Sequence, residues 1–240
     1  CMPHYYKITG SHGQGAETIM HAEAAFMQGR FTDAHIALER AYAQIEGNGQ
    51  ENMALCCDFL ARRLSLFTDI GQRAKLEKRR ERLLAHHNVS WLNLWNAAAA
   101  YHHALLGSTD SIPEAYRRHR LFTVRTLAPG KPMIEMIENQ VYLAQGEYAH
   151  VIGRSEGLLT QCEAMHYALV ALHIRIQTAA AYEMLGKHGE ARALLERALA
   201  DAEPDGFALP FAENFRYLEP LLTERLQDLS LIHISEPTRH

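Results

Sequence analysis

The sequence predicts an all-α protein in which about five irregular helix pairs stack as an α-solenoid. Three observations predict this class. Apolar residues recur at helical spacing throughout the chain, and no segment shows the alternating pattern of a strand. Glycines at which we expect helices to end fall at positions 29, 71, 107, 146 and 186, with intervals of 42, 36, 39 and 40 residues. One spacing of small and large apolar residues occurs near both ends of the chain.

The clearest helix pair covers residues 179–204. Its first helix is expected to end at Gly186, because glycine tolerates positive φ, and the second to begin near His188. Small residues lie where the two helices touch, and larger apolar residues fill the space beside them. These residues are Ala179, Tyr182, Ala191, Leu195 and Ala198. Pro204 closes the pair.

The same spacing recurs near the other end of the chain, in Gly29, Phe31, Ala34, Leu38 and Ala41. This order of residues resembles a tetratricopeptide (TPR) repeat. The resemblance implies a right-handed solenoid, in which further copies between these two stack and bury their apolar faces. The intervals exceed the ~34-residue TPR period, and Leu76 and Val151 replace the alanine in the middle copies.

The remaining elements follow from capping residues and helix-ending glycines. Thr32 or Asp33, and Ser90, are typical of helix N-caps, and Pro113 and Pro132 are typical of a first helical turn. The expected helices cover residues 16–28, 33–46, 51–69, 72–87, 91–106, 113–128, 132–145, 148–161, 165–185 and 188–203. An atypical element is expected at 205–227.

Composition excludes several classes. The 240 residues are 48% hydrophobic, enough for a continuous core, and the net charge of −4 gives no strong attraction to nucleic acid. No apolar run reaches the ~18 residues of a membrane span, and no signal peptide is evident. The four cysteines show no disulfide framework, and Cys56 and Cys57 are expected to be core or near-core thiols of a cytoplasmic protein. We expect no membrane partner, no direct nucleic-acid binding by this chain and no cofactor.

The chain is expected to have three segments. Residues 16–228 form the TPR-like helical repeat domain, and residues 1–15 are a disordered or incomplete N-terminal segment. Residues 229–240, LSLIHISEPTRH, resemble the translation of a sequencing adapter, so we expect a non-native tail there. The native protein is then expected to continue beyond Asp228.

The end of the repeat domain carries a more specific resemblance. Residues 202–207 are Ala-Glu-Pro-Asp-Gly-Phe, and Phe211, Leu218, Leu221 and Leu222 follow. This segment resembles the end of the sensor region of MalT-like transcription regulators of the LuxR class. Asp205 in place of Glu, and Asn214-Phe215 in place of an acidic-Gly pair, depart from that pattern. The resemblance is closest over residues 178–224 and looser over 16–177.

The resemblance implies a parent regulator with a nucleotide-binding switch module, this helical sensor and a C-terminal helix-turn-helix. No GxxxxGK[ST] loop occurs here, so ATP hydrolysis and DNA binding are expected of other modules. We expect the chain to bind a small effector or a regulatory protein and to contact the parent's other modules, and not to be an enzyme. The alternative is a TPR scaffold of a signalling protein without a transcriptional role.

A binding groove is expected on the inner face, which the first helix of each pair lines in TPR-like stacks. Counting from the helix-ending glycines places six residues there: Asp58, Arg62, Ser65, Tyr101, Gln140 and His173. Mixed polar and aromatic side chains suit a small effector or an extended peptide. Trp91 and Trp95, four residues apart, share a helical face and are expected to pack in the core.

Two further clusters of residues, one of arginines and one of cysteine and histidines, allow both a functional and a simpler explanation. Arg79, Arg80, Arg117 and Arg118 lie on equivalent helices of successive repeats, so stacking would gather them into a basic ridge. A solvated helix face is the commoner explanation, and docking of an acidic surface, or of nucleic acid near the parent's DNA-binding module, is the alternative. Three further residues, Cys162, His166 and His173, share a helical spacing that suits metal ligands, but scattered histidines more often cap helices, and we expect no metal.

Overall fold

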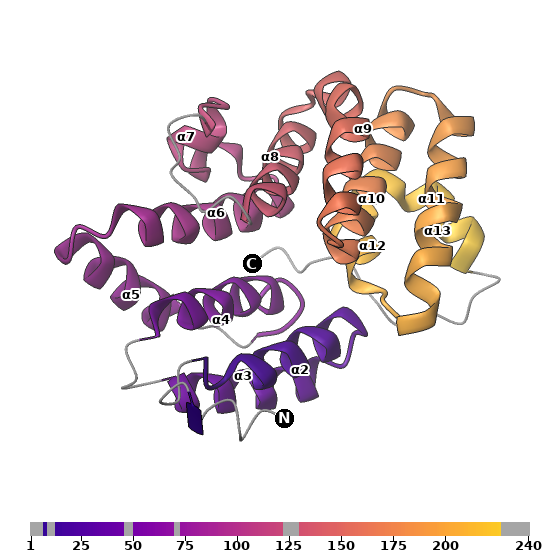
Figure 1. The fold of residues 1–240 in the computed structure, drawn as a ribbon. Coiled ribbons are helices and arrows are strands. Elements are labelled where there is room, and N and C mark those ends of the chain that lie inside the picture. Colours follow the sequence, from indigo (N-terminus) through magenta and orange to yellow (C-terminus); the bar gives the residue numbers. More distant parts are fainter. Residues whose placement is uncertain (1–6, 9–12, 46–49, 70–72, 122–129, 227–240) are drawn as a thin grey trace. The chain divides into compact units, whose positions relative to one another are not determined.

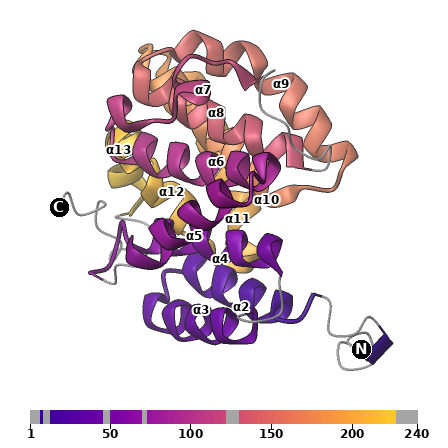
Figure 2. The ribbon, with the colours of Figure 1, turned by 90° about the vertical axis from the view of Figure 1, so that its left-hand side faces the viewer.

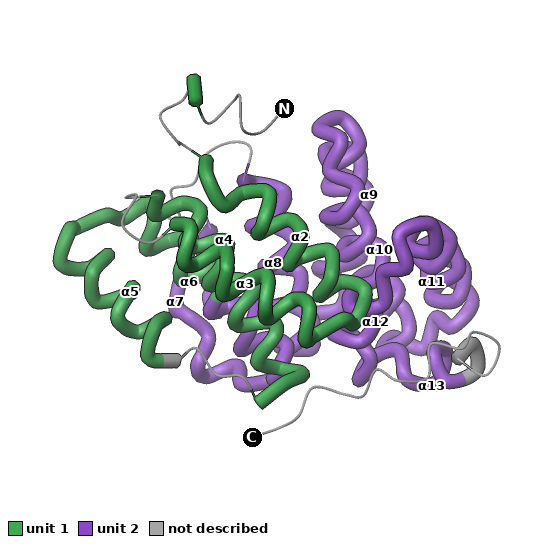
Figure 3. Tube along the Cα trace, turned by 90° about the horizontal axis from the view of Figure 1, so that it is seen from below, with its two compact units in different colours: residues 1–98 green, residues 99–240 purple. Residues whose placement is uncertain are grey.

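The structure, a computed structural model, describes residues 7–8, 13–45, 50–69, 73–121 and 130–226 (Figure 1). The regular elements within these ranges are all helices, which confirms the all-α prediction. The chain divides into two compact units, residues 1–98 and 99–240, and the division falls inside helix α6 (Val89–Leu105) (Figure 3). In the described part of the chain, no helix is both long and apolar enough to cross a membrane.

Unit 1 begins with the pair α2 (Ala16–Met27) and α3 (Phe31–Ile45), which lie side by side (Figures 1 and 2). Helix α4 (Glu51–Leu64) packs against both, and α5 (Arg73–Ala85) follows it. Three residues of the repeated spacing are fully buried: Ala34, Leu38 and Ala41. The N-terminal copy of the repeated spacing therefore forms a packed helix pair.

Unit 2 is built around α10 (Ala168–Met184). It packs against α8 (Lys131–Gln145), α9 (Tyr148–Ala164) and α11 (His188–Ala202). Residues 170–181 of α10 are all buried except Arg175, as expected of a helix covered on every side. Ala179, Ala191, Leu195 and Ala198 are at most 2% exposed, so the predicted contact of α10 with α11 is confirmed.

Short elements complete unit 2. The 3-10 turn η1 (Thr109–Ser111) and the single-turn helix α7 (Glu114–Arg117) precede α8. A second 3-10 turn, η4 (Glu203–Asp205), follows α11 and leads to α12 (Leu209–Glu213) and α13 (Phe215–Leu226). Both C-terminal helices pack against α10, so the atypical element expected at 205–227 closes the core of this unit.

Seven helices of the described chain end in the same way. The first or second residue after the helix takes a positive φ, and two backbone N–H groups bond back to the last turn, as in the Schellman motif. Glycine occupies this position at 29, 107, 146 and 186, as predicted. Histidine occupies it at 87, 119 and 166, with φ between 50 and 57°. Gly71 and the expected Gly47–Gly49 turn lie outside the described residues.

Several predicted boundaries are wrong. Helix α9 continues to Ala164, three residues beyond its expected end, and α10 begins at Ala168, three residues after its expected start. Helix α4 ends at Leu64, five residues before the expected end at Asp69. Helix α6 begins at Val89, so Ser90 lies inside the helix and does not cap it. Within its described residues, the helix expected over 113–128 breaks after the single turn of α7, because the chain takes a left-handed conformation at His119 with φ 51°. Residues 122–129 and the tail 229–240 lie outside the described residues.

Candidate functional site

Two buried side chains of unit 2, those of Tyr101 and His173, meet the buried carboxylate of Glu213, the last residue of α12. Tyr101 of α6 donates a hydrogen bond to Oε2 of Glu213 over 2.9 Å. The Nδ1 atom of His173, on α10, lies 3.9 Å from the same oxygen and 3.5 Å from the Tyr101 hydroxyl. All three residues are at most 3% exposed. The cluster joins α12 to two helices that are far away in sequence.

A chain of buried amides continues from this cluster. Gln177 of α10 donates to Oε1 of Gln140 on α8 over 2.9 Å and to the carbonyl of Met136 over 3.1 Å. Gln140 donates in turn to Oδ1 of Asn214 over 3.1 Å, and Asn214 donates to the carbonyl of Pro210. The amides therefore join α10 and α8 to the turn between α12 and α13.

Three of the six predicted groove residues take part in these contacts. Tyr101, Gln140 and His173 come from α6, α8 and α10, and each contacts Glu213 or Asn214. The three residues therefore lie close together around the end of α12. Their side chains are buried against the chain's own α12, and they offer no exposed surface in this structure. Contact of these three residues with an effector stays a prediction.

The other three predicted groove residues belong to unit 1, with Asp58 and Arg62 on α4 and Ser65 directly after its last residue. Asp58 is buried and accepts a hydrogen bond from the Tyr42 hydroxyl over 2.8 Å and another from Nε of Arg79. Arg79 also bonds Glu51 over 3.1 Å. Burial raises the pKa of Asp58, and the neighbouring Arg79 cation offsets this only in part. The arrangement is an interior ion-pair network.

Arg62 and Ser65 complete that set. The Arg62 guanidinium lies 4.4 Å from the centre of the Trp95 ring, and the Ser65 hydroxyl donates to the Arg62 carbonyl over 2.8 Å. Trp95 is buried, which confirms its expected core position, whereas Trp91 is half-buried. The six predicted groove residues are divided between two units, so a single groove lined by all of them stays a prediction.

The basic ridge is divided in the same way. Arg79 and Arg80 belong to unit 1, and Arg117 and Arg118 to unit 2, so their gathering into one surface stays a prediction. The charge of Arg79 is compensated by Asp58 and Glu51, whereas Arg80 is exposed. Arg118 is exposed and pairs with Glu114 one helical turn away, over 3.3 Å.

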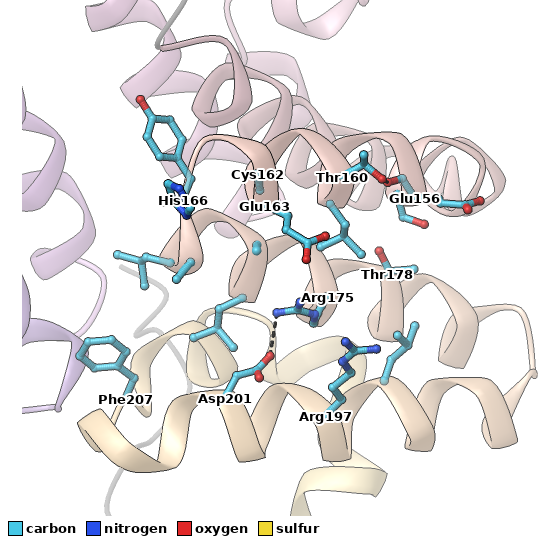
Figure 4. Close-up of a pocket in the computed structure, with 18 of the residues that line it drawn as sticks. Glu156, Thr160, Cys162, Glu163, His166, Arg175, Thr178, Arg197, Asp201 and Phe207 are labelled. Atoms are coloured by element: carbon cyan, nitrogen blue, oxygen red, sulfur yellow. Dashed lines mark hydrogen bonds and ion pairs between the residues drawn. The ribbon is translucent and has the colours of Figure 1, made fainter.

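An open pocket of about 770 Å³ lies on the other side of α10, between α9 and α11 (Figure 4). Its apolar lining comes from all three helices and from the segment after α11: Leu159, Leu169, Leu172, Tyr182, Leu194 and Phe207. Exposed polar residues at its rim include Thr160 and Asp201. The volume lies within the ~300–1,000 Å³ of typical small-molecule sites.

Charged side chains face each other across this pocket. Glu163 of α9 and Arg197 of α11 both point into the space between their helices (Figure 4). Among the described residues neither side chain has an ion-pair or hydrogen-bond partner. At the floor, Arg175 of α10 pairs with Asp201 of α11 over 2.7 Å. The pocket thus presents an unpaired carboxylate on one wall and an unpaired guanidinium on the other.

The metal alternative finds no support in the described residues, where no group of three His, Cys, Asp or Glu side chains is placed to hold an ion. Helix α9 ends at Ala164, so Cys162 and His173 lie on different helices and the expected shared face does not exist. Cys162 and His166 line the pocket, whereas His173 contacts Glu213.

Burial raises the pKa of Cys162, although Arg175 opposes this, so the thiol lacks the lowered pKa of a reactive cysteine. Cys57 is buried, as expected of a core thiol, whereas Cys56, the next residue on α4, is exposed.

The pocket residues were not singled out from the sequence. Glu156 and Glu163, seven residues apart, share one face of α9, and Leu194, Arg197 and Asp201 share one face of α11. Helical spacing alone could have grouped them. It could not indicate that these two faces diverge from α10 and leave space between them, because that depends on packing in three dimensions.

Comparisons of the chain with models of protein families, with curated proteins and with solved structures found no significant match.

Proposed function

We propose that this chain is a ligand-sensing domain, a TPR-like right-handed solenoid from a MalT-like regulator of the LuxR class, which binds a small effector or a regulatory protein. The observation that carries binding is the pocket of about 770 Å³ between α9, α10 and α11. It combines apolar walls with a few charged groups, which is the usual composition of a small-molecule site. The regulator class rests on the resemblance of residues 178–224.

The position of α10 supports a sensing role. One side of this helix supplies Leu172 and Arg175 to the pocket. The other side supplies His173 and Gln177 to the buried contacts with Glu213 and Gln140. A ligand that moves α9 or α11 against α10 would therefore act on a helix that also holds the C-terminal elements. This link couples the two sites only if ligand binding in the pocket changes the contacts that α10 makes with α12.

The binding proposal is tested by thermal unfolding of the chain with a library of small metabolites and peptides. A true ligand raises the midpoint of unfolding, because it binds only the folded state. The variant Thr160→Trp places a large ring at the pocket rim and should abolish the shift. Ala193→Trp, which puts the same ring on an exposed position of α11 outside the pocket, should leave the shift intact. A ligand whose effect survives Thr160→Trp binds elsewhere and contradicts the assignment.

The regulator class is tested separately, by sequencing the source DNA across both ends of the encoding segment. A helix-turn-helix within about 100 residues after Asp228, together with a nucleotide-binding module before Cys1, would support the regulator. A stop codon or further TPR pairs would instead favour the alternative, a TPR scaffold for another signalling protein. Residues 229–240 would be native only if the same DNA encodes them.

A further inference from the structure

We propose that the pocket takes a short dipolar peptide, with its cationic group against α9 and its carboxylate against α11. This inference deepens the proposed function and rests on the pocket being the binding site. The geometry points to this class through the opposite charges that the two walls present. It names a ligand chemistry for a site that the sequence did not indicate.

The wall formed by α9 is acidic. Glu156 and Glu163 both line the pocket and are exposed, and neither carboxylate has a partner among the described residues. Figure 4 shows the carboxylate of Glu163 directed away from its own helix into the pocket. An ammonium or guanidinium group is the natural partner of such a wall, because it would neutralise charges that now face only solvent.

The wall formed by α11 carries the complementary charge. Arg197 points toward α9 in Figure 4 and has no partner in the described chain. Arg175 is already engaged by Asp201 at 2.7 Å, so Arg197 is the guanidinium here that can receive a ligand carboxylate. A planar guanidinium suits a carboxylate because it can offer two parallel N–H donors.

The size and apolar lining favour a peptide over a single amino acid. The volume of about 770 Å³ matches a drug-sized ligand, and one amino acid would fill a small part of it. Leu159, Leu172 and Leu194 line the pocket from its three helices. An apolar side chain between the two charged ends of the peptide would cover this surface, which is where most of the binding free energy would arise.

The test uses the tripeptide Lys-Leu-Glu with free termini and two modified forms, one acetylated at the amino terminus with its lysine also acetylated, the other amidated at both carboxyl groups. Isothermal titration against the full chain should show binding of the free tripeptide. The dissociation constant of each modified form should be higher by a factor of up to about five, the range expected for loss of a partly exposed ion pair. Equal binding of all three forms would overturn the proposal.

Variants assign the two walls. Arg197→Gln should weaken binding of the free and the acetylated peptide about fivefold and leave binding of the amidated form unchanged. Glu163→Gln should weaken binding of the free and the amidated peptide and leave binding of the acetylated form unchanged. The matched controls Arg192→Gln and Glu190→Gln change exposed residues of α11 outside the pocket and should have no effect. If the library reveals a Thr160→Trp-sensitive ligand without both charges, the binding proposal stands and the dipolar class fails.

Discussion

Tyr101 and Glu213 are 112 residues apart in sequence, yet the tyrosine hydroxyl donates a hydrogen bond to the glutamate carboxylate over 2.9 Å in the interior of unit 2. The tyrosine belongs to α6 and the glutamate to α12, so the bond ties the start of the unit to its C-terminal elements. A buried carboxylate must keep its donors, because the loss of one exposes the full cost of its desolvation.

Tyr101→Phe removes this donor and keeps the ring. We expect it to lower the free energy of unfolding by about 1–3 kcal/mol, the cost of leaving a buried acceptor short of one hydrogen bond. Urea unfolding followed by circular dichroism measures the change. Tyr148→Phe, which alters a half-buried tyrosine on α9, serves as the control and should cost less. If the two variants lose equal stability, the bond contributes nothing specific.

Glu138 gives the chain a stability that depends on pH. Burial alone would raise the pKa of Glu138, but His119 and Arg154 outweigh burial and hold this pKa below its ordinary value of 4.5. The Nδ1 atom of His119 lies 3.4 Å from one carboxylate oxygen, and Arg154 bonds the other. A folded-state pKa below the unfolded one stabilises the protein at pH values above about 4.5, and this contribution is lost as the pH falls through the lowered pKa.

Glu138→Gln should therefore destabilise the chain at pH 7, and the difference from the unmodified protein should shrink as the pH falls through the lowered pKa of Glu138. In the acid range Glu138 itself becomes neutral, so the two proteins converge. Unfolding by urea at a series of pH values measures the difference. Glu190→Gln, which changes an exposed residue of α11, provides the comparison. A constant difference across the series would show that the lost contact is one of packing.

The histidines at helix ends adopt a backbone conformation that favours glycine. His87 follows α5 with φ 50° and is exposed, so its side chain contributes little to packing. His87→Gly should raise the free energy of unfolding by about 0.5–1 kcal/mol, because glycine adopts positive φ without the steric cost of a Cβ atom. Gly186→Ala tests the converse. A Cβ atom at Gly186 would meet no atom within 4 Å, so Gly186→Ala should lower the free energy of unfolding by about 1 kcal/mol through the backbone conformation alone.

The sequence predicted the helix pairs well because their signals are local. Gly29 and Gly186 end helices as expected, and the alanines near them lie in the helix contacts, since both features depend on spacing within one pair. The predicted ends of α4 and α7 were wrong because, in the described chain, no glycine follows the observed end of either helix to mark it. A histidine in the left-handed conformation, as at His119, carries no comparable sequence signal.

The candidate site was harder to predict for a physical reason. The repeat register grouped Tyr101, Gln140 and His173 as lining one groove, which stays a prediction, and the structure brings the three residues together around Glu213 and Asn214. The register could not indicate that Glu213 and Asn214 of the chain itself would cover them, because the bonds from Tyr101 and Gln140 join residues 112 and 74 positions apart. Arg197 lies on an exposed helix face, where a charged residue is the commonest choice, so nothing in the sequence distinguished it.

Ala191 tests the close packing on which the helix pairs depend. It is fully buried where α10 and α11 meet, and Ala193, two residues later on the same helix, is exposed. Ala191→Leu forces three extra carbon atoms into a filled contact and should lower the free energy of unfolding by about 1–3 kcal/mol. Ala193→Leu adds the same atoms at the surface and should change it by less than about 0.5 kcal/mol. Because the two changes are chemically identical, unfolding curves that coincide would mean that α10 and α11 do not pack as closely as the repeated alanines indicate.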